Sequence, residues 1–455
     1  MRPGRHAGAT DPEHEHHAVN EPLAREEGLV RAIGPWALAA NAINLTIGAG
    51  IFALPAVVAA MLGPAAVVAY LVCGALIMMV LICYVELGTR ITRSGGTVAY
   101  IEEAFGPLAG FLAWALYGIG FNAAAVAAIV HVMLDALATV IPSLAGTGPA
   151  RSITIVVFFL GLAALNIRGV RTGTGLSFIT TAAKLVPLLL LIVVGVFAIQ
   201  GSNLTWTGWP PLSAFGSATL VLFFAFSSAE GALSPSGEIR DPVRTIPRGL
   251  LGGATIVVLI YVAVHLVAQG VLGAELAQGS TTPLADTARR LMGATGAGLI
   301  VAGTAISVFG NLAADMIGSP RTFLAAAESG LLPRALTRVH PTFRTPWVAI
   351  VVYVLINITL ALSGGFRPLA VLASMSLLLV YLGICLAALR IRYTRPHIPG
   401  TFRAPGGPTI ALMASAVVVW VLAQSTRREI VAMAIFIGVS LAYYLIRSRM
   451  VNGER

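Results

Sequence analysis

Residues 47 to 52 of the chain read Ile47-Gly48-Ala49-Gly50-Ile51-Phe52 and lie inside an apolar stretch that runs from about residue 36 to 60. Two glycines that flank one alanine weaken a continuous helix, and Asn41, Asn44 and Pro55 interrupt the same stretch. We therefore predict a broken helix. Unpaired backbone groups are costly at membrane depth, so such a break indicates a protected or watery cavity.

The amino-acid composition indicates that the predicted break lies inside a membrane. Hydrophobic residues occupy 57% of the 455 positions and charged residues only 11%, which is too few to cover a water-soluble core. Apolar spans recur along the chain and predict about twelve transmembrane helices. The spans are residues 36–60, 64–89, 107–141, 152–167, 174–199, 213–233, 249–272, 294–318, 346–362, 367–389, 406–424 and 429–446.

The distribution of positive charge along the chain is also typical of a membrane protein. The net charge of +10 does not indicate nucleic acid, because the basic residues lie between apolar spans rather than on a basic water-facing surface. With twelve spans, 22 arginines lie on the side of both termini and six on the other. This asymmetry predicts a multi-pass protein of the cytoplasmic membrane, surrounded by lipid, with both termini cytoplasmic.

The start of the chain and the cysteines add little chemistry. Residues 1–30 contain no apolar run, so we expect a disordered cytoplasmic tail. The three cysteines are odd in number and lie inside apolar spans, which favours packing over disulfides. No acidic or cysteine cluster accompanies the tail histidines, so we expect no metal and no cofactor.

A second break is predicted in the span from residue 213 to 233. Phe223-Phe224-Ala225-Phe226-Ser227-Ser228-Ala229-Glu230-Gly231 places small polar residues and a carboxyl group in mid-span, about 180 residues after the first break. Paired interruptions of this kind are typical of an inverted repeat with a substrate site near the membrane midplane. The alternative is that the glycines only allow close helix packing.

These residues resemble a known family. Ile47-Gly48-Ala49-Gly50-Ile51-Phe52 is similar to the Gly-Ser-Gly-Ile-Phe signature of the amino acid-polyamine-organocation transporters. Further matches follow in the family's order, at Tyr84 to Gly88, Ser94 to Gly96, Phe223 to Glu230, Gly237 to Arg248, Asn311 to Arg321 and Ser329 to Pro333. The resemblance covers nearly the whole chain.

The resemblance implies an all-α membrane protein with the leucine-transporter fold. In that fold two inverted five-helix repeats, here residues 31–200 and 201–390, are followed by two further helices in residues 391–455. Helices 1 and 6 are discontinuous, and access to a central amino acid site alternates between the two sides.

The same resemblance implies the substrate contacts. The substrate carboxylate would meet backbone amides near Ala49, Gly50 and Ile51, and its amine would meet carbonyls near Ile47, Phe224 and Ser227. Gly48 and Ser228 complete the two breaks. Phe224 matches the aromatic residue that closes over the substrate; it replaces the Trp of arginine-agmatine exchangers, which argues against that narrower function.

Lys184, the single lysine, is the candidate for coupling. It lies about eleven residues from the cytoplasmic end of its span, or roughly 16 Å deep, where an ammonium is costly. Ser177 and Thr181 share its helix face, and Ser307 on the eighth helix is a plausible neighbour. In family members an ammonium here replaces the sodium of sodium-coupled relatives. Lys184 could carry a proton or could be a fixed brace.

The other ionisable groups receive more structural interpretations. Glu230 is expected to brace the second break by accepting hydrogen bonds, with proton carriage as the alternative. Glu86 and Arg90 are spaced to pair on one helix face, and Asp315 is expected in a gate or loop ion pair.

For the substrate side chain we expect contacts with Asn122 and Ala229. The third and tenth spans hold no acidic residue in mid-span, which favours a neutral amino acid.

The sequence thus predicts a secondary transporter of an amino acid, sodium-independent and coupled to protons through Lys184. Two alternatives stay open: an obligate amino acid exchanger with a structural Lys184, and a permease for cationic amino acids or polyamines. No catalytic cluster suggests an enzyme, and no filter or charge ring suggests a channel. A receptor that does not transport would share the binding motif. The protein is expected to be a monomer or a weak homodimer.

Overall fold

The structure is a computed structural model of the chain and describes residues 32–91, 95–169, 174–206, 208–234, 236–395 and 398–453. For residues 174–183, 237 and 450–453 it describes the backbone alone. The predicted tail and the side chains of Ser177 and Thr181 lie outside what it describes. Within the described ranges the chain is helical, and its extended pairing is a single parallel bridge between Ile33 and Ile239.

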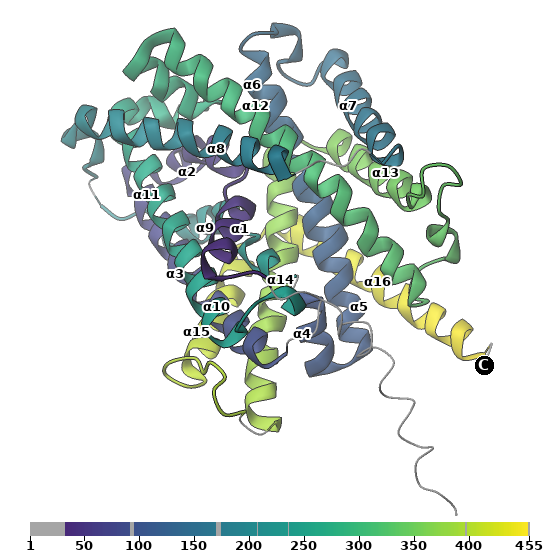
Figure 1. The fold of residues 1–455 in the computed structure, drawn as a ribbon. Helices are drawn as coiled ribbons and strands as arrows, with labels where there is room; N and C mark the ends of the chain where they lie inside the picture. Colours follow the sequence, from purple (N-terminus) through teal and green to yellow (C-terminus); the bar gives the residue numbers. More distant parts are fainter. Residues whose placement is uncertain are drawn as a thin grey trace, which may run out of the picture.

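Figure 1 shows how the helices are arranged. The α-helices, taken with the helical segments η4, η8, η10 and η11, vary in length from 5 residues in α10 to 46 in α12. They are α1 (Pro35–Thr46), α2 (Gly50–Leu62), α3 (Ala66–Arg90), α4 (Gly96–Phe105), α5 (Pro107–Ala115), η4 (Leu116–Ala123), α6 (Ala124–Ala138), α7 (Pro149–Ile167), α8 (Thr174–Gly195), α9 (Leu212–Phe226), η8 (Ala229–Leu233), α10 (Pro242–Ile246), η10 (Pro247–Leu251), α11 (Gly252–Leu272), η11 (Gly273–Ala277), α12 (Pro283–Glu328), α13 (Trp347–Ser363), α14 (Phe366–Thr394), α15 (Thr409–Leu422) and α16 (Arg427–Gly453).

The helical surface suits lipid. Among the described residues, eight helical segments are long and apolar enough to cross a membrane, and three shorter apolar helices accompany them. Large apolar side chains such as Ile153 on α7, Leu259 on α11 and Val439 on α16 are more than 60% exposed. Exposed apolar faces of this extent are stable only in an apolar solvent. The chain is therefore a multi-pass membrane protein.

The interior brings the two predicted breaks together. Figure 1 shows α1 and α9 near the middle of the bundle, while α16 lies at its edge. A Cβ added to Gly50 would lie 3.0 Å from the Cα of Ala225, so the absence of a side chain at Gly50 permits this approach of α2 to α9. The bundle centre is thus formed where both helices are interrupted.

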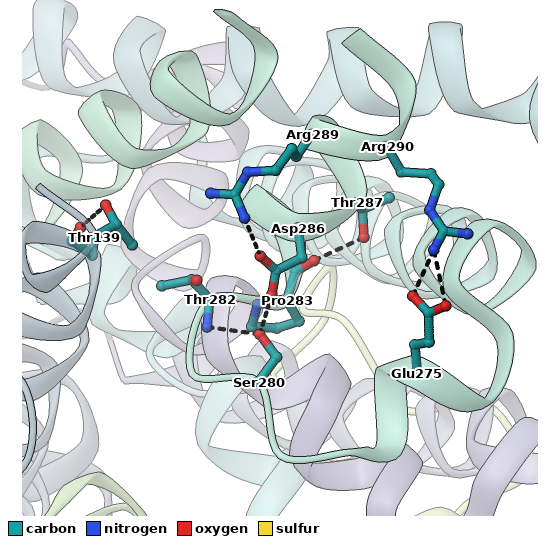
Figure 2. A network of polar contacts seen from close by, with 10 residues as sticks. Thr139, Glu275, Ser280, Thr282, Pro283, Asp286, Thr287, Arg289 and Arg290 are labelled. Atoms are coloured by element: carbon teal, nitrogen blue, oxygen red, sulfur yellow. Dashed lines mark hydrogen bonds and ion pairs between the residues drawn. The ribbon is translucent and has the colours of Figure 1, made fainter. Parts of the chain in front are cut away.

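One side of the bundle is closed by the loop from Gly273 to Gly293. Figure 2 shows two ion pairs in this loop. Arg290 pairs with Glu275 of η11 at 2.7 Å, and Arg289 pairs with Asp286 at 3.1 Å. At Gly293 the backbone leaves helical geometry, with φ of 67°, so the first turns of α12 fold back over the bundle. Leu284 from these turns is fully buried near Phe52 and Thr304, and only about 10 Å³ remains between them.

On the opposite side the predicted pair of Glu86 and Arg90 does not form. Glu86 instead accepts hydrogen bonds from Arg392 of α14 at 2.9 and 2.7 Å and from the backbone amide of Ala404. Both charged side chains are at most 5% exposed. The planar guanidinium can bind both carboxylate oxygens at once, and this geometry outweighs the i, i+4 spacing of Arg90.

His131 and Asp135, which are also four residues apart, do not stand alone. Arg151, at the start of α7, donates to Asp135 Oδ1 at 2.7 Å and approaches His131 Nδ1 at 3.1 Å. His131 Nε2 lies 3.0 Å from the carbonyl oxygen of Ala361. This cluster joins α6, α7 and α13, so His131 is a partnered packing residue.

Candidate functional site

The first break leaves two helix ends facing each other. α1 ends at Thr46, Ile47 has φ of −73° and ψ of 87°, and α2 begins at Gly50. The start of α2 has no side-chain cap, and the first amides of a helix have no partner within it. These amides and the helix dipole favour an anion such as a carboxylate.

The second break follows α9. Ser227 is extended, with ψ of 167°, and Ser228 is left-handed, with φ of 83°. A left-handed backbone is costly for serine, and such strain is concentrated at functional sites. Ser227 Oγ donates to the carbonyl oxygen of Phe224 at 2.7 Å, which stabilises the turn without a continuing helix. The structure thus interrupts both segments where the sequence predicts.

A cavity of about 460 Å³ lies between these breaks, within the size range of small-molecule sites. Its wall combines the two breaks with one face of the helix formed by η4 and α6 and one face of α12. The lining residues that matter here are Gly48, Ala49, Gly50, Tyr117, Phe121, Asn122, Phe224, Ser227, Ser228, Ser234, Asn311, Asp315, Ser319 and Thr322.

The cavity reaches solvent at one end. Ser234, Gly318 and Thr322 line it and are exposed, whereas the region of Phe52, Leu284 and Thr304 beyond its other end is buried. The Phe224 ring also packs edge-on against Phe366, with centroids 5.7 Å apart.

Most predicted substrate residues lie at this cavity, but not all do. Gly48, Ala49, Gly50, Asn122, Phe224, Ser227 and Ser228 line it. Ile47 and Ile51 are fully buried behind the break, so only their backbone groups suit the predicted contacts. Ala229 is 1% exposed and lies outside the wall, so the expected contact between its side chain and the substrate does not form here.

Lys184 lies on α8 beside the first break. Its side chain is 4% exposed, and Nζ donates to the backbone carbonyl of Asn44 at 2.5 Å. The last carbonyls of a helix lack partners within it and form the negative end of its dipole. The ammonium therefore compensates the end of α1, as a bound cation would.

Ser307 does not share this contact. Its hydroxyl is buried and has no hydrogen-bond partner among the described residues. Ser307, expected as a neighbour of Lys184, therefore forms no hydrogen bond with it in this structure. Thr304, one turn away, bonds the carbonyl oxygen of Ile300 in its own helix at 2.7 Å, as hydroxyls in membrane helices often do.

Glu230 is 1% exposed and is held between two tyrosines. Tyr117 of η4 donates to its Oε1 at 3.3 Å, and Tyr381 of α14 donates to its Oε2. Hydrogen bonds to the backbone at Ser228 and Glu230 complete its surroundings. The geometry matches the predicted brace, and Glu230 connects the second break to η4 and α14.

Asn122 was predicted from the sequence, but its neighbours Tyr117 and Phe121 in η4 were not. Residues Leu116–Ala123 form a π-helical turn, which turns Tyr117, Phe121 and Asn122 toward the cavity. Such turns are frequent at functional sites. A Cβ on Gly120 would lie 2.5 Å from Ser376 Oγ, so this glycine allows α14 to approach. Gly118 and Gly120 were the sequence feature that could have indicated this turn.

Asp315 differs from its prediction. Its carboxylate accepts hydrogen bonds from Ser319 Oγ at 2.6 Å and from Tyr353 OH at 2.7 Å. Within the described ranges its partners are these two hydroxyls rather than a cation. It lines the cavity instead of closing a loop ion pair.

Comparison with known proteins finds similar transporters. The chain is 29% identical to the serine/threonine exchanger SteT of Bacillus subtilis, over 93% of this chain and 98% of that protein. It is 27% identical to the methylthioribose transporter of Bacillus subtilis, over 94% and 95% of the two chains. It is also 24% identical to the branched-chain amino acid permease BcaP of the same organism, over 93% and 94%.

A family model described as amino acid permease matches residues 33–445. This range contains both breaks, Lys184 and every helix that lines the cavity. The family and these relatives are transporters and not enzymes. The chain therefore belongs to the amino acid permease family and is a membrane transporter.

Proposed function

We propose that this protein is a secondary active transporter that moves an amino acid across the cytoplasmic membrane by alternating access. The observation that carries the proposal is the cavity between two helix breaks, open at one end and closed at the other. A site reached from one side at a time is what alternating access requires.

The substrate's common groups fit the two breaks. The uncapped start of α2 offers amides at Gly50 and Ile51 to the carboxylate. The carbonyls near Ile47, Phe224 and Ser227 are the proposed partners of the amine. Because both breaks line one cavity, an α-amino acid placed between them would meet both sets of groups.

The membrane arrangement completes the proposal. We infer twelve crossings arranged as two inverted five-helix repeats, residues 31–200 and 201–390, with two further helices in residues 391–455. The excess of arginine beside the termini supports a cytoplasmic location for both. The open end of the cavity lies by Ser234, and we infer that this end faces the cytoplasm, which would make this an inward-facing state.

Coupling is assigned to Lys184. Its Nζ already neutralises the end of α1, so a sodium ion is not needed there. Release of its proton to one side would remove that compensation and favour another position of α1. This step would couple proton flow to substrate flow.

Uptake into proteoliposomes tests the function. We expect a screen of the twenty labelled amino acids to show saturable uptake or exchange of at least one, without sodium and increased by an inward proton gradient. Empty liposomes are the control. Absence of flux for all twenty in both uptake and exchange formats would refute the proposal, and a strict requirement for sodium would refute the role of Lys184.

A further inference from the structure

The cavity wall contains one charged side chain among the described residues, that of Asp315. The other lining residues are apolar or neutral and polar. A carboxylate inside a membrane protein is costly unless a cation or a proton compensates it. Asp315 therefore marks the part of the cavity where a positive group is most stable.

The carboxylate is fixed and still has room to bind. Ser319 Oγ, one turn further along α12, occupies Oδ1, and Tyr353 OH from α13 occupies Oδ2. Two carboxylate oxygens offer about four acceptor positions, so about two remain for a further donor. A Lys-type ammonium, with three donors, can use them.

The distance between the first break and Asp315 sets the length of side chain that a bound amino acid needs to reach the carboxylate. Asn311 lies against the first break, since its amide nitrogen is 3.4 Å from the position of a Cβ on Gly48. Asp315 is four residues further along α12, or about 6 Å at the helical rise. The stem of a lysine side chain, four methylene groups long, spans roughly this distance.

We propose that Asp315 binds the distal ammonium of a basic amino acid whose α-amino and carboxylate groups lie at the two breaks. This inference rests on the proposed function and sets its substrate class. It replaces the expectation of a neutral side chain, which depended on acidic residues being absent from the middle of the third and tenth spans and on Asp315 belonging to a gate or loop ion pair.

The test compares two probes that differ in the ammonium alone. L-Lysine and L-norleucine share a four-carbon side chain, so their ratio of kcat/KM in proteoliposomes measures recognition of the amine. We expect wild-type protein to prefer lysine, and Asp315→Asn to lower kcat/KM for lysine about 10- to 100-fold while norleucine changes less than about threefold.

Three further measurements make the result specific. Retained norleucine flux shows that Asp315→Asn is folded. Asp286→Asn, the same change in the loop of Figure 2 outside the cavity, should leave the lysine to norleucine ratio unchanged. Asp315→Glu extends the carboxylate by one methylene and should shift preference from lysine toward the shorter ornithine.

The outcomes separate the two proposals. Norleucine transported as well as lysine by wild-type protein, or an unchanged ratio in Asp315→Asn, would overturn the role of Asp315 while the transporter function stands. Loss of both fluxes in Asp315→Asn and Asp315→Glu, with each still monodisperse, would also overturn it, because a recognition role predicts selective loss. Absence of flux for all amino acids in wild-type protein would refute the function itself.

Discussion

At the scale of single residues, two side chains hydrogen-bond to the carbonyl groups at the end of α1. Lys184 meets the carbonyl of Asn44, and Tyr261 donates to the carbonyl of Thr46 at 2.9 Å. Both contacts stabilise a helix end that has lost its continuation. The sequence predicted the lysine because a lone ammonium deep in an apolar span needs a function. It did not identify Asn44 O as the partner, because that contact spans 140 residues.

Two substitutions separate a proton-carrying Lys184 from a bracing one. Arginine keeps the charge but does not release its proton in proteins, whereas alanine removes the charge. If Lys184 releases a proton, then Lys184→Arg and Lys184→Ala should both lose the dependence of uptake on the pH gradient. Uptake with and without the gradient is measured in proteoliposomes. A variant Lys184→Arg with wild-type pH dependence would contradict coupling and leave a brace.

At the scale of elements, features set by neighbouring residues were predictable from the sequence, whereas features set by contacts between distant residues were not. Both helix breaks were predictable, because glycine and serine pairs inside apolar spans act within a few residues. The π-helical turn at Leu116–Ala123 was not, since its register depends on packing against α14. Likewise, Glu86 found Arg392 at 306 residues of separation, in preference to Arg90 on its own helix.

The pair between Glu86 and Arg392 gives a prediction of stability. Breaking one partner of a buried pair leaves an uncompensated charge and costs about 3–5 kcal/mol. We expect Glu86→Gln to lower the apparent melting temperature of detergent-solubilised protein clearly. Glu86→Leu combined with Arg392→Leu should recover most of that loss.

The exposed pair of Asp241 and Arg244 provides the matched control. Its two side chains are 51% and 77% exposed, so Asp241→Asn should leave the melting temperature nearly unchanged. Equal melting temperatures for Glu86→Gln and wild-type protein would show that this pair does not hold α3 to α14.

At the scale of the whole molecule, the sequence predicted an all-helical membrane protein and the permease family, which the structure and the comparisons confirm. Composition and two short motifs were sufficient for this. The course of the cavity could not be predicted, because it depends on how α12 lies against both breaks. Asp315 shows this limit, because its position near the end of its span favoured a gate or loop ion pair, whereas the structure places it in the cavity wall.

The most direct test of the central claim is whether transport depends on the close contact between the two breaks. Gly50→Val adds a branched side chain where even a Cβ is 3.0 Å from Ala225, so it should separate α2 from α9 and fill the cavity. Gly161→Val on α7, where nothing lies within 4 Å, is the matched control.

Counterflow of a labelled amino acid that the screen identifies is then measured for wild-type protein and both variants, each verified as monodisperse. We predict counterflow by wild-type protein and Gly161→Val, and at least a tenfold loss in Gly50→Val, since about 1.4 kcal/mol of misfit is enough for that factor. Wild-type counterflow in Gly50→Val would contradict a substrate site at the two breaks.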